Sequence, residues 1–252
     1  MTAIAADETP APAPATRETI YRHGLAVRVT HWINVLVISL LLMSGLNILE
    51  AHPRLYWGQF GADFDRPWFE LATWLPHGLP GWATLPEHRD LAVARRWHFF
   101  LAWAFVINGA VYYLFGLISG HLRRDLAPTG ADIRPRNIWR SVVDHIRLRH
   151  PVGDEAKRYN ILQKFAYLAV IVLLLPAMVL SGLTMSPGVD AALPWLTSLF
   201  GGRQSARAIH FITANLIVLF VIVHIVEVFL AGVWNEIRSM ITGRYVIRTG
   251  AH

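Results

Sequence analysis

The chain of 252 residues contains no cysteine and has few charged side chains. Without thiols it forms no disulfide, iron–sulfur cluster, Cys-ligated zinc site or covalently attached c-type haem. Charged residues make up 16% of the chain and hydrophobic residues 54%, whereas soluble globular domains contain roughly 25% charged residues. The composition therefore favours a membrane protein, and the twelve histidines are the side chains left to bind a redox metal.

Four stretches are apolar over the length of about 20 residues that a bilayer requires. No Asp, Glu, Lys or Arg interrupts them, and four such runs rarely occur together in a soluble core. The sequence thus predicts an all-α membrane protein, with a bundle of four transmembrane helices in a domain over residues 20–248. Before it, residues 1–19 with their PAPAPA run are predicted to be a disordered tail and not a cleavable signal peptide. The predicted spans are 30–49, 98–119, 165–185 and 208–226.

Basic residues are unevenly divided between the two ends of this bundle. Sixteen Lys and Arg fall in the two tails and in the loop between the second and third spans, and seven fall in the other two loops. Because positively charged loops stay in the cytoplasm, we expect a multi-pass protein of the bacterial inner membrane with both termini in the cytoplasm. Basic loops held beside the membrane lipid account for the net charge of +6, so no nucleic-acid partner is expected.

The two long loops differ in character. The first outer loop, residues 50–97, contains Trp57, Trp68, Trp74 and Trp82. Tryptophan gathers both at lipid headgroups and in the cores of protein interfaces, so this loop is expected to lie on the membrane, to dock a partner, or to do both. The basic stretch 133–150 in the middle loop is predicted to form an amphipathic helix on the inner surface.

Four histidines lie within the apolar spans, where ionisable residues usually mark function. His210 and His224 are 14 residues apart, which places them within about 40° on one helix face and about 21 Å apart along the axis. His98, at the start of the second span, shares the outer level with His210. His31 in the first span shares the inner level with His224. Two imidazole pairs at two depths are the axial ligands that two b-type haems require.

A zinc site or metal-ion channel is the main chemical alternative, because it also uses histidine. Such sites bring three or four ligands to one depth, often with carboxylates, whereas these histidines separate into pairs. Gly45, 14 residues after His31, would let a porphyrin edge approach the first span at the outer level. Ordinary close packing of membrane helices explains this glycine equally well.

Other polar residues near the four histidines are further candidates. Arg28, Arg96 and Arg207 each lie within three residues of one of them, so they suit haem propionates or snorkelling at the interface. Glu227 and His121 lie at the inner ends of the fourth and second spans, where they would bind a quinone, relay its protons or be solvated. No nucleophile and general-base constellation is visible, which favours electron transfer.

Three segments carry the four histidines: RVTHWINVL, ARRWHFFLAW and IHFITANLIVLFVIVHIVE. In these segments the chain resembles the four-helix di-haem cytochrome b superfamily, which includes cytochrome subunits of nickel–iron hydrogenases, gamma subunits of formate dehydrogenases and thiosulfate reductase cytochromes. The likeness extends over residues 21–245. It implies an inner haem b held by His31 and His224, an outer haem b held by His98 and His210, and a quinone that exchanges electrons at the inner haem.

A second set of segments is AHPRLYWG, SGHLRRDLAP, FGGRQSARAIHF and RSMITGRY. They are similar to a bacterial subgroup associated with a molybdopterin oxidoreductase of the sulfite-oxidase type. This resemblance implies an extracytoplasmic partner of that kind, docked at the Trp-rich loop, and a subunit that carries electrons between it and the quinone pool. Two alternatives remain: a self-contained quinol-dependent reductase of superoxide or a ferric chelate, and a non-redox metal transporter.

Overall fold

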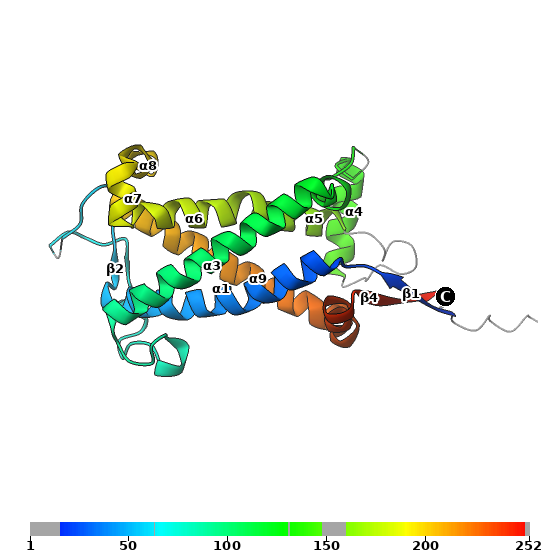
Figure 1. Ribbon diagram of the computed structural model, residues 1–252, viewed down its shortest axis with the longest axis horizontal. Helices are drawn as coiled ribbons and strands as arrows, with labels where there is room; N and C mark the ends of the chain where they lie inside the picture. The colour runs from blue at the N-terminus through cyan, green and yellow to red at the C-terminus, as the bar shows by residue number, and fades with distance from the viewer. Residues whose placement is uncertain (1–15, 63, 131, 148–159, 250–252) are drawn as a thin grey trace, which may run out of the picture.

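A computed structural model describes residues 16–62, 64–130, 132–147 and 160–249. Four long apolar helical spans form an elongated bundle (Figure 1), so the mostly helical four-span fold is confirmed. The third span is a continuous run of three segments. The spans are α1 (Leu25–Ala51), α3 (Leu91–Ile118), α5 (Ile161–Leu168) with η4 (Ala169–Leu174) and α6 (Leu175–Thr184), and α9 (Arg203–Thr242).

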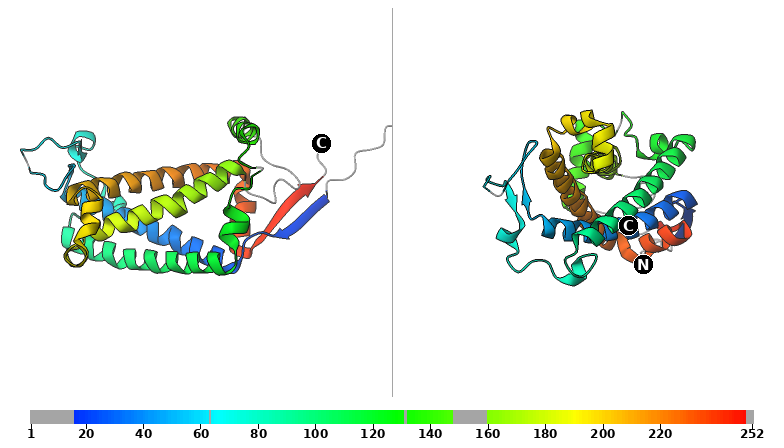
Figure 2. Two further views of the ribbon diagram at one scale, coloured as in Figure 1. Left: turned by 90° about the horizontal axis from the view of Figure 1, so that it is seen from above. Right: turned by 60° about the vertical axis from the view of Figure 1, so that its left-hand side comes forward.

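Both described ends of the chain lie at one end of the bundle, the terminal end (Figure 2). The long connection between α1 and α3 lies at the opposite end, the loop end (Figure 1). At the terminal end η2 (Leu122–Leu126) is followed by α4 (Pro135–Ile146), so the amphipathic stretch is helical as predicted. The loop end holds β2 (Arg54–Leu55), β3 (Phe69–Glu70), α2 (Leu71–Trp74), η1 (Gly81–Ala83), α7 (Pro187–Ala192) and α8 (Pro194–Leu199).

A two-stranded antiparallel ribbon extends from the terminal end (Figure 2). It pairs β1 (Thr16–Tyr21) with β4 (Arg244–Thr249), with Thr16 opposite Thr249. The expected disordered tail is therefore wrong for residues 16–19, while residues 1–15 lie outside the described part of the chain. The sequence did not reveal this strand because its pairing partner lies at the far end of the chain.

The spans pack as two antiparallel hairpins, α1 with α3 and α6 with α9. Val37 of α1 and Phe105 of α3 meet in a small apolar core that also receives Val179 of α6. A buried amide adds a polar link, because Asn108 Nδ2 donates to the Thr30 carbonyl oxygen at 2.9 Å. Most apolar side chains on the flanks of the spans are exposed, as the surface of a membrane bundle requires.

The third span changes its hydrogen-bond register before Pro176. η4 is a π-helical segment whose final bond runs from the Leu175 N–H to the Val170 carbonyl. In that register the next carbonyl, that of Ile171, would accept from residue 176, but proline has no N–H. The hydroxyl of Tyr113 on α3 donates to the Ile171 carbonyl instead. The helix is thus loosened just before Pro176, and this creates a contact between two spans.

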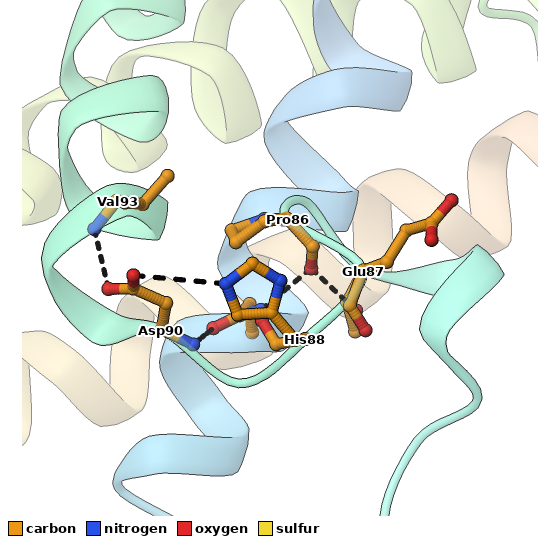
Figure 3. Close-up of polar contacts among 7 residues, drawn as sticks. Pro86, Glu87, His88, Asp90 and Val93 are labelled. Atoms are coloured by element: carbon orange, nitrogen blue, oxygen red, sulfur yellow. Dashed lines mark hydrogen bonds and ion pairs between the residues drawn. The ribbon is translucent and has the colours of Figure 1, made fainter.

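The long loop is fixed to α1 and to the start of α3. Asn47 is fully buried near the end of α1, and its Nδ2 donates to the carbonyl oxygens of Pro86 and His88, each at 2.9 Å. Asp90 caps α3 by accepting from the Val93 N–H at 3.0 Å, and its carboxylate lies 4.0 Å from His88 Nε2 (Figure 3). These contacts determine where α3 begins, and therefore where His98 lies.

The same loop also provides a hydrogen-bond acceptor for backbone N–H groups at the start of α9. The carbonyl of Gly58 accepts from the backbone N–H groups of Gln204 and Ser205, both at 3.1 Å, which are free donors at a helix N-terminus. Glycine is needed at position 202, because its φ is 110° and a Cβ there would lie 2.6 Å from the Gly58 oxygen. The loop and the start of α9 thus pack backbone against backbone, seven residues before His210.

Candidate functional site

The structure brings the four span histidines together in two pairs. Near the loop end, the ring centroids of His98 on α3 and His210 on α9 are 6.2 Å apart. Nearer the terminal end, those of His31 on α1 and His224 on α9 are 6.3 Å apart. All four rings are half-buried. We call these the loop-end pair and the terminal-end pair.

The separation within each pair is suited to one metal ion between two imidazoles. Metal–nitrogen bonds of about 2.0 Å, with about 1.1 Å from each nitrogen to its ring centre, give about 6.2 Å between centroids. In the described part of the chain, no group of three or more His, Asp or Glu side chains converges on one point. The donor set therefore fits a haem iron with two axial imidazoles and does not fit a four-ligand zinc site.

Polar groups on neighbouring helices hold the loop-end pair. His98 Nδ1 lies 3.0 Å from Ser44 Oγ on α1. On the other side, His210 Nδ1 lies 3.1 Å from both Ser181 Oγ and the Met178 carbonyl oxygen of α6. Histidines that bind metals commonly donate their second ring N–H to such acceptors, which fixes the ring and leaves the other nitrogen for the metal.

Each of these serines is followed by a glycine that faces the same ring. A Cβ at Gly45 would lie 3.5 Å from His98 Cε1, and one at Gly182 would lie 3.2 Å from His210 Cε1. The sequence placed Gly45 at the outer level of the bundle, and the structure places it beside His98. Small residues at these positions let the helices approach the histidine rings closely.

Aromatic rings surround the terminal-end pair. The His224 ring stacks on Phe220, with centroids 6.0 Å apart and planes 10° apart. His31 meets Trp32 edge-on at 5.5 Å. Among the residues that the structure describes, no hydrogen bond reaches the ring of either histidine. The two pairs thus have different surroundings, one polar and one aromatic.

The three candidate arginines are placed differently. Arg28 donates from Nη1 to the Ile241 carbonyl, and Arg207 donates from Nη2 to the His52 carbonyl. Arg28 Nε is buried and, within the described ranges, has no hydrogen-bond partner. A buried donor without an acceptor is costly, so this atom fits a missing anionic group such as a propionate. Arg96 is exposed on α3, and its predicted role stays a prediction, as does that of Arg207.

A cavity of about 190 Å³ lies at the terminal end and is lined by basic and aromatic side chains. His121 lines it, together with His23, which is only 9% exposed. Burial, followed by the positive charge of Arg22, lowers the pKa of His23 to about 4, so this imidazole is neutral at neutral pH. Glu227, half-buried on α9 one turn after His224, is not among the lining residues. The full lining comprises Arg22, His23, Gly24, Val27, Phe115, Ser119, His121 and Arg124.

Aromatic residues of the long loop cover the start of α9. Trp57 stacks on Trp68 with centroids 5.5 Å apart. Trp68 and Phe69 both contact Phe211, at 6.3 and 4.7 Å, directly beside His210. Other aromatic side chains of the loop remain at the surface. These exposed residues are Phe60, Phe64, Trp74 and Trp82.

Sequence reasoning missed several residues of these sites. Ser44, Ser181 and Asn108 are buried polar residues within the spans, and polar groups at membrane depth could have drawn attention to them. The sequence did not mark His23 as a site residue. It is buried where the segment before α1 meets the distant residue Gly243, whose carbonyl accepts from the Arg22 N–H at 2.8 Å, and no local pattern reveals this contact.

Comparison with known proteins gives consistent matches. A relative from Azospira oryzae, named as a candidate protein-methionine-sulfoxide reductase subunit (YedZ1), is 32% identical over 228 residues, which cover 90% of this chain and 99% of that protein. Two relatives are named as candidate B-type cytochrome subunits of nickel–iron hydrogenases. They come from Rhodobacter capsulatus and Cupriavidus necator and are each 24% identical, covering 83% and 96% of this chain and 73% and 88% of their own. No solved structure matches the chain significantly.

The family match runs over residues 22–243 and so includes all four spans and both histidine pairs. Membership implies haem b and a role as a membrane electron-transfer subunit, which is what the paired imidazoles suit. The chain belongs to the prokaryotic cytochrome b561 family.

Proposed function

We propose that the chain carries electrons across the membrane through two b-type haems, one at each histidine pair. The observation that carries this proposal is the ring separation of 6.2 and 6.3 Å in pairs at two depths of one bundle. The bound haems supply one-electron transfer. The two histidine pairs, whose members on α9 are about 21 Å apart along the helix axis, would hold these haems, and burial and hydrogen bonds around the imidazoles would tune their potentials.

The cavity at the terminal end is the proposed quinone site. An apolar cavity of about 150 Å³ accepts a benzene ring, so the cavity of about 190 Å³ suits a quinone headgroup. Arg22 and Arg124 offer hydrogen bonds to its carbonyl oxygens. Neutral His23 is suited to form a hydrogen bond with a quinone oxygen, and His121, which lines the same cavity, is the proposed acceptor of a proton that a quinol releases when it is oxidised.

The terminal end is proposed to face the cytoplasm of a bacterium, and the loop end the outside of its inner membrane. The excess of basic residues at the terminal end supports this orientation. We further propose that an extracytoplasmic molybdopterin oxidoreductase docks on the exposed aromatic residues of the long loop. The relative named as a sulfoxide reductase subunit supports such a partner. A quinol oxidised at the terminal end would then supply two electrons and release its two protons there, and reduction of a sulfoxide to a thioether and water at the partner would take up two protons on the other side of the membrane.

Counting haems in single variants tests the two-haem proposal. The unaltered protein should show two b-type haems per chain in a pyridine haemochrome assay. His224→Ala should lose the terminal-end haem and keep the other, and His98→Ala should do the reverse. His77→Ala, which changes an exposed loop histidine, should keep both. One haem in the unaltered protein, or loss of both in either span variant, would overturn the pairing.

A further inference from the structure

A short sequence occurs twice, once beside each histidine of the loop-end pair. Residues 43–46 read Met-Ser-Gly-Leu and residues 180–183 read Leu-Ser-Gly-Leu. The first copy lies on α1 and the second on α6, the spans that form the antiparallel hairpins with α3 and α9. Each hairpin therefore presents a Ser-Gly pair to a histidine on its other helix. The bundle has an approximate twofold symmetry at this level.

The hydrogen bonds determine which ring nitrogen carries the proton. His210 Nδ1 lies 3.1 Å from the Met178 carbonyl oxygen, and because a carbonyl only accepts, Nδ1 must carry a hydrogen. The Ser181 hydroxyl donates to the Ala177 carbonyl at 2.6 Å. Its oxygen is therefore free to accept from His210 Nδ1. The remaining nitrogen, Nε2, keeps its lone pair for a metal.

The other hairpin repeats this arrangement. The Ser44 hydroxyl donates to the Leu41 carbonyl at 3.0 Å and accepts from His98 Nδ1 at 3.0 Å. Ser44 and Ser181 are both fully buried, so neither hydroxyl has water as a substitute partner. Both histidines occupy the eighth position of their helices, counted from Leu91 and Arg203.

We propose that Ser44 and Ser181 are paired positioning residues for the haem at the loop-end pair. At His210 the Met178 carbonyl fixes the hydrogen on Nδ1 and Ser181 shares it, and at His98 Ser44 accepts it. By accepting these hydrogens the two serines would make the rings stronger donors to ferric iron. This inference rests on the two-haem function proposed above. The terminal-end pair has aromatic neighbours in place of these hydroxyls, so the device distinguishes one haem from the other.

Redox titration of the purified full-length protein, loaded with haem in detergent, tests the proposal. The loop-end haem is identified as the one that His98→Ala lacks. Ser44→Ala should shift its ferric–ferrous equilibrium at least threefold toward ferrous iron, which is about 28 mV more positive for one electron, and Ser181→Ala should shift it in the same direction by a smaller amount. The ferric electron paramagnetic resonance signal of the same haem should change, and that of the other haem should not. In Ser181→Ala the Met178 carbonyl still accepts from His210 Nδ1, so this variant should retain the haem even where Ser44→Ala loses it.

Ser39→Ala is the matched control, because Ser39 is an exposed serine on α1 that donates to its own helix, to the Val35 carbonyl at 2.7 Å. It should leave both haems unchanged. Unaltered potential and resonance signal in both serine variants would overturn the inference, as would an equal shift in Ser39→Ala or a shift of the terminal-end haem. Absence of haem from the unaltered protein would instead remove the proposed function itself.

Discussion

At the scale of single residues, the polar groups inside the spans do most to define the sites. A hydropathy average shows only that a span lacks charged residues. It does not predict where Ser, Asn or His should lie within the span. The structure gives these residues partners: Asn108 Nδ2 donates to Asn34 Oδ1 at 2.8 Å, and Ser44 contacts His98. In a bilayer such groups require internal partners, because no water is present to replace them.

The two site glycines are expected to differ in their tolerance of a methyl group. A Cβ at position 182 would lie 3.2 Å from His210 Cε1, which is closer than ordinary contact, whereas at position 45 it would lie at 3.5 Å from His98 Cε1. Gly182→Ala should therefore displace the His210 ring and shift the absorption and potential of the loop-end haem. Gly45→Ala should have little effect on either.

Gly188→Ala serves as a control, because a Cβ there meets nothing within 4 Å. Visible spectra and redox titration of the three purified variants provide the comparison. Equal effects of Gly45→Ala and Gly182→Ala would contradict the prediction.

The level and pairing of the histidines could be anticipated from the sequence because helical rise and span direction are regular. His210 and His224 share one helix face at two depths, and the structure brings each of them within contact of the histidine expected at that depth. The serine partners could not be anticipated in this way. Their role depends on how far α1 and α6 are rotated about their own axes, and the apolar spans carry no pattern that fixes this rotation.

At the scale of elements, every predicted span is found, but the helices extend further. The fourth span was predicted to end at residue 226, whereas α9 continues to Thr242, with a break at Gly232, where φ is 104° and ψ is 83°. Hydropathy reports the part of a helix that crosses lipid and not where the hydrogen bonding stops. Beyond the break, the carbonyls of Met240 and Ile241 accept from Trp32 and Arg28 of α1.

The contact at the π-helical segment yields a prediction for a double-mutant cycle. Tyr113→Phe removes the donor to the Ile171 carbonyl and should lower the free energy of unfolding by about 1 kcal/mol. In a Pro176→Ala background the restored N–H supplies a donor within the helix itself. In that background Tyr113→Phe should leave the free energy of unfolding nearly unchanged.

Unfolding of the four proteins by dodecyl sulfate titration in mixed micelles measures the cycle. A cost of Tyr113→Phe that is the same in both backgrounds would show that the missing proline N–H is not the reason for the contact. A proline within a helix leaves a carbonyl without its N–H donor, but the sequence does not reveal that Tyr113 compensates for it, because that depends on the packing of α3.

At the scale of the whole molecule, the orientation of the bundle can be measured directly because the chain has no cysteine. Phe64 in the long loop is 92% exposed and Trp139 on α4 is 69% exposed. In intact spheroplasts, a membrane-impermeant maleimide should label Phe64→Cys and should label Trp139→Cys only after the membrane is permeabilised. The unaltered chain should not be labelled and serves as the negative control. The reverse pattern would invert the proposed orientation, and labelling of both in intact cells would contradict the four-span topology.

The histidine pairs impose an order on biosynthesis. α9 supplies one histidine to each pair, and it leaves the ribosome after the other three spans. A nascent chain that has inserted α1, α3 and the third span holds His31 and His98, but neither has its partner. A prosthetic group that needs two imidazoles therefore cannot be captured at the loop-end pair until translation has passed residue 210, or at the terminal-end pair until it has passed residue 224. Chains that end before residue 210 should therefore remain without haem, and haem content should report whether synthesis has passed α9.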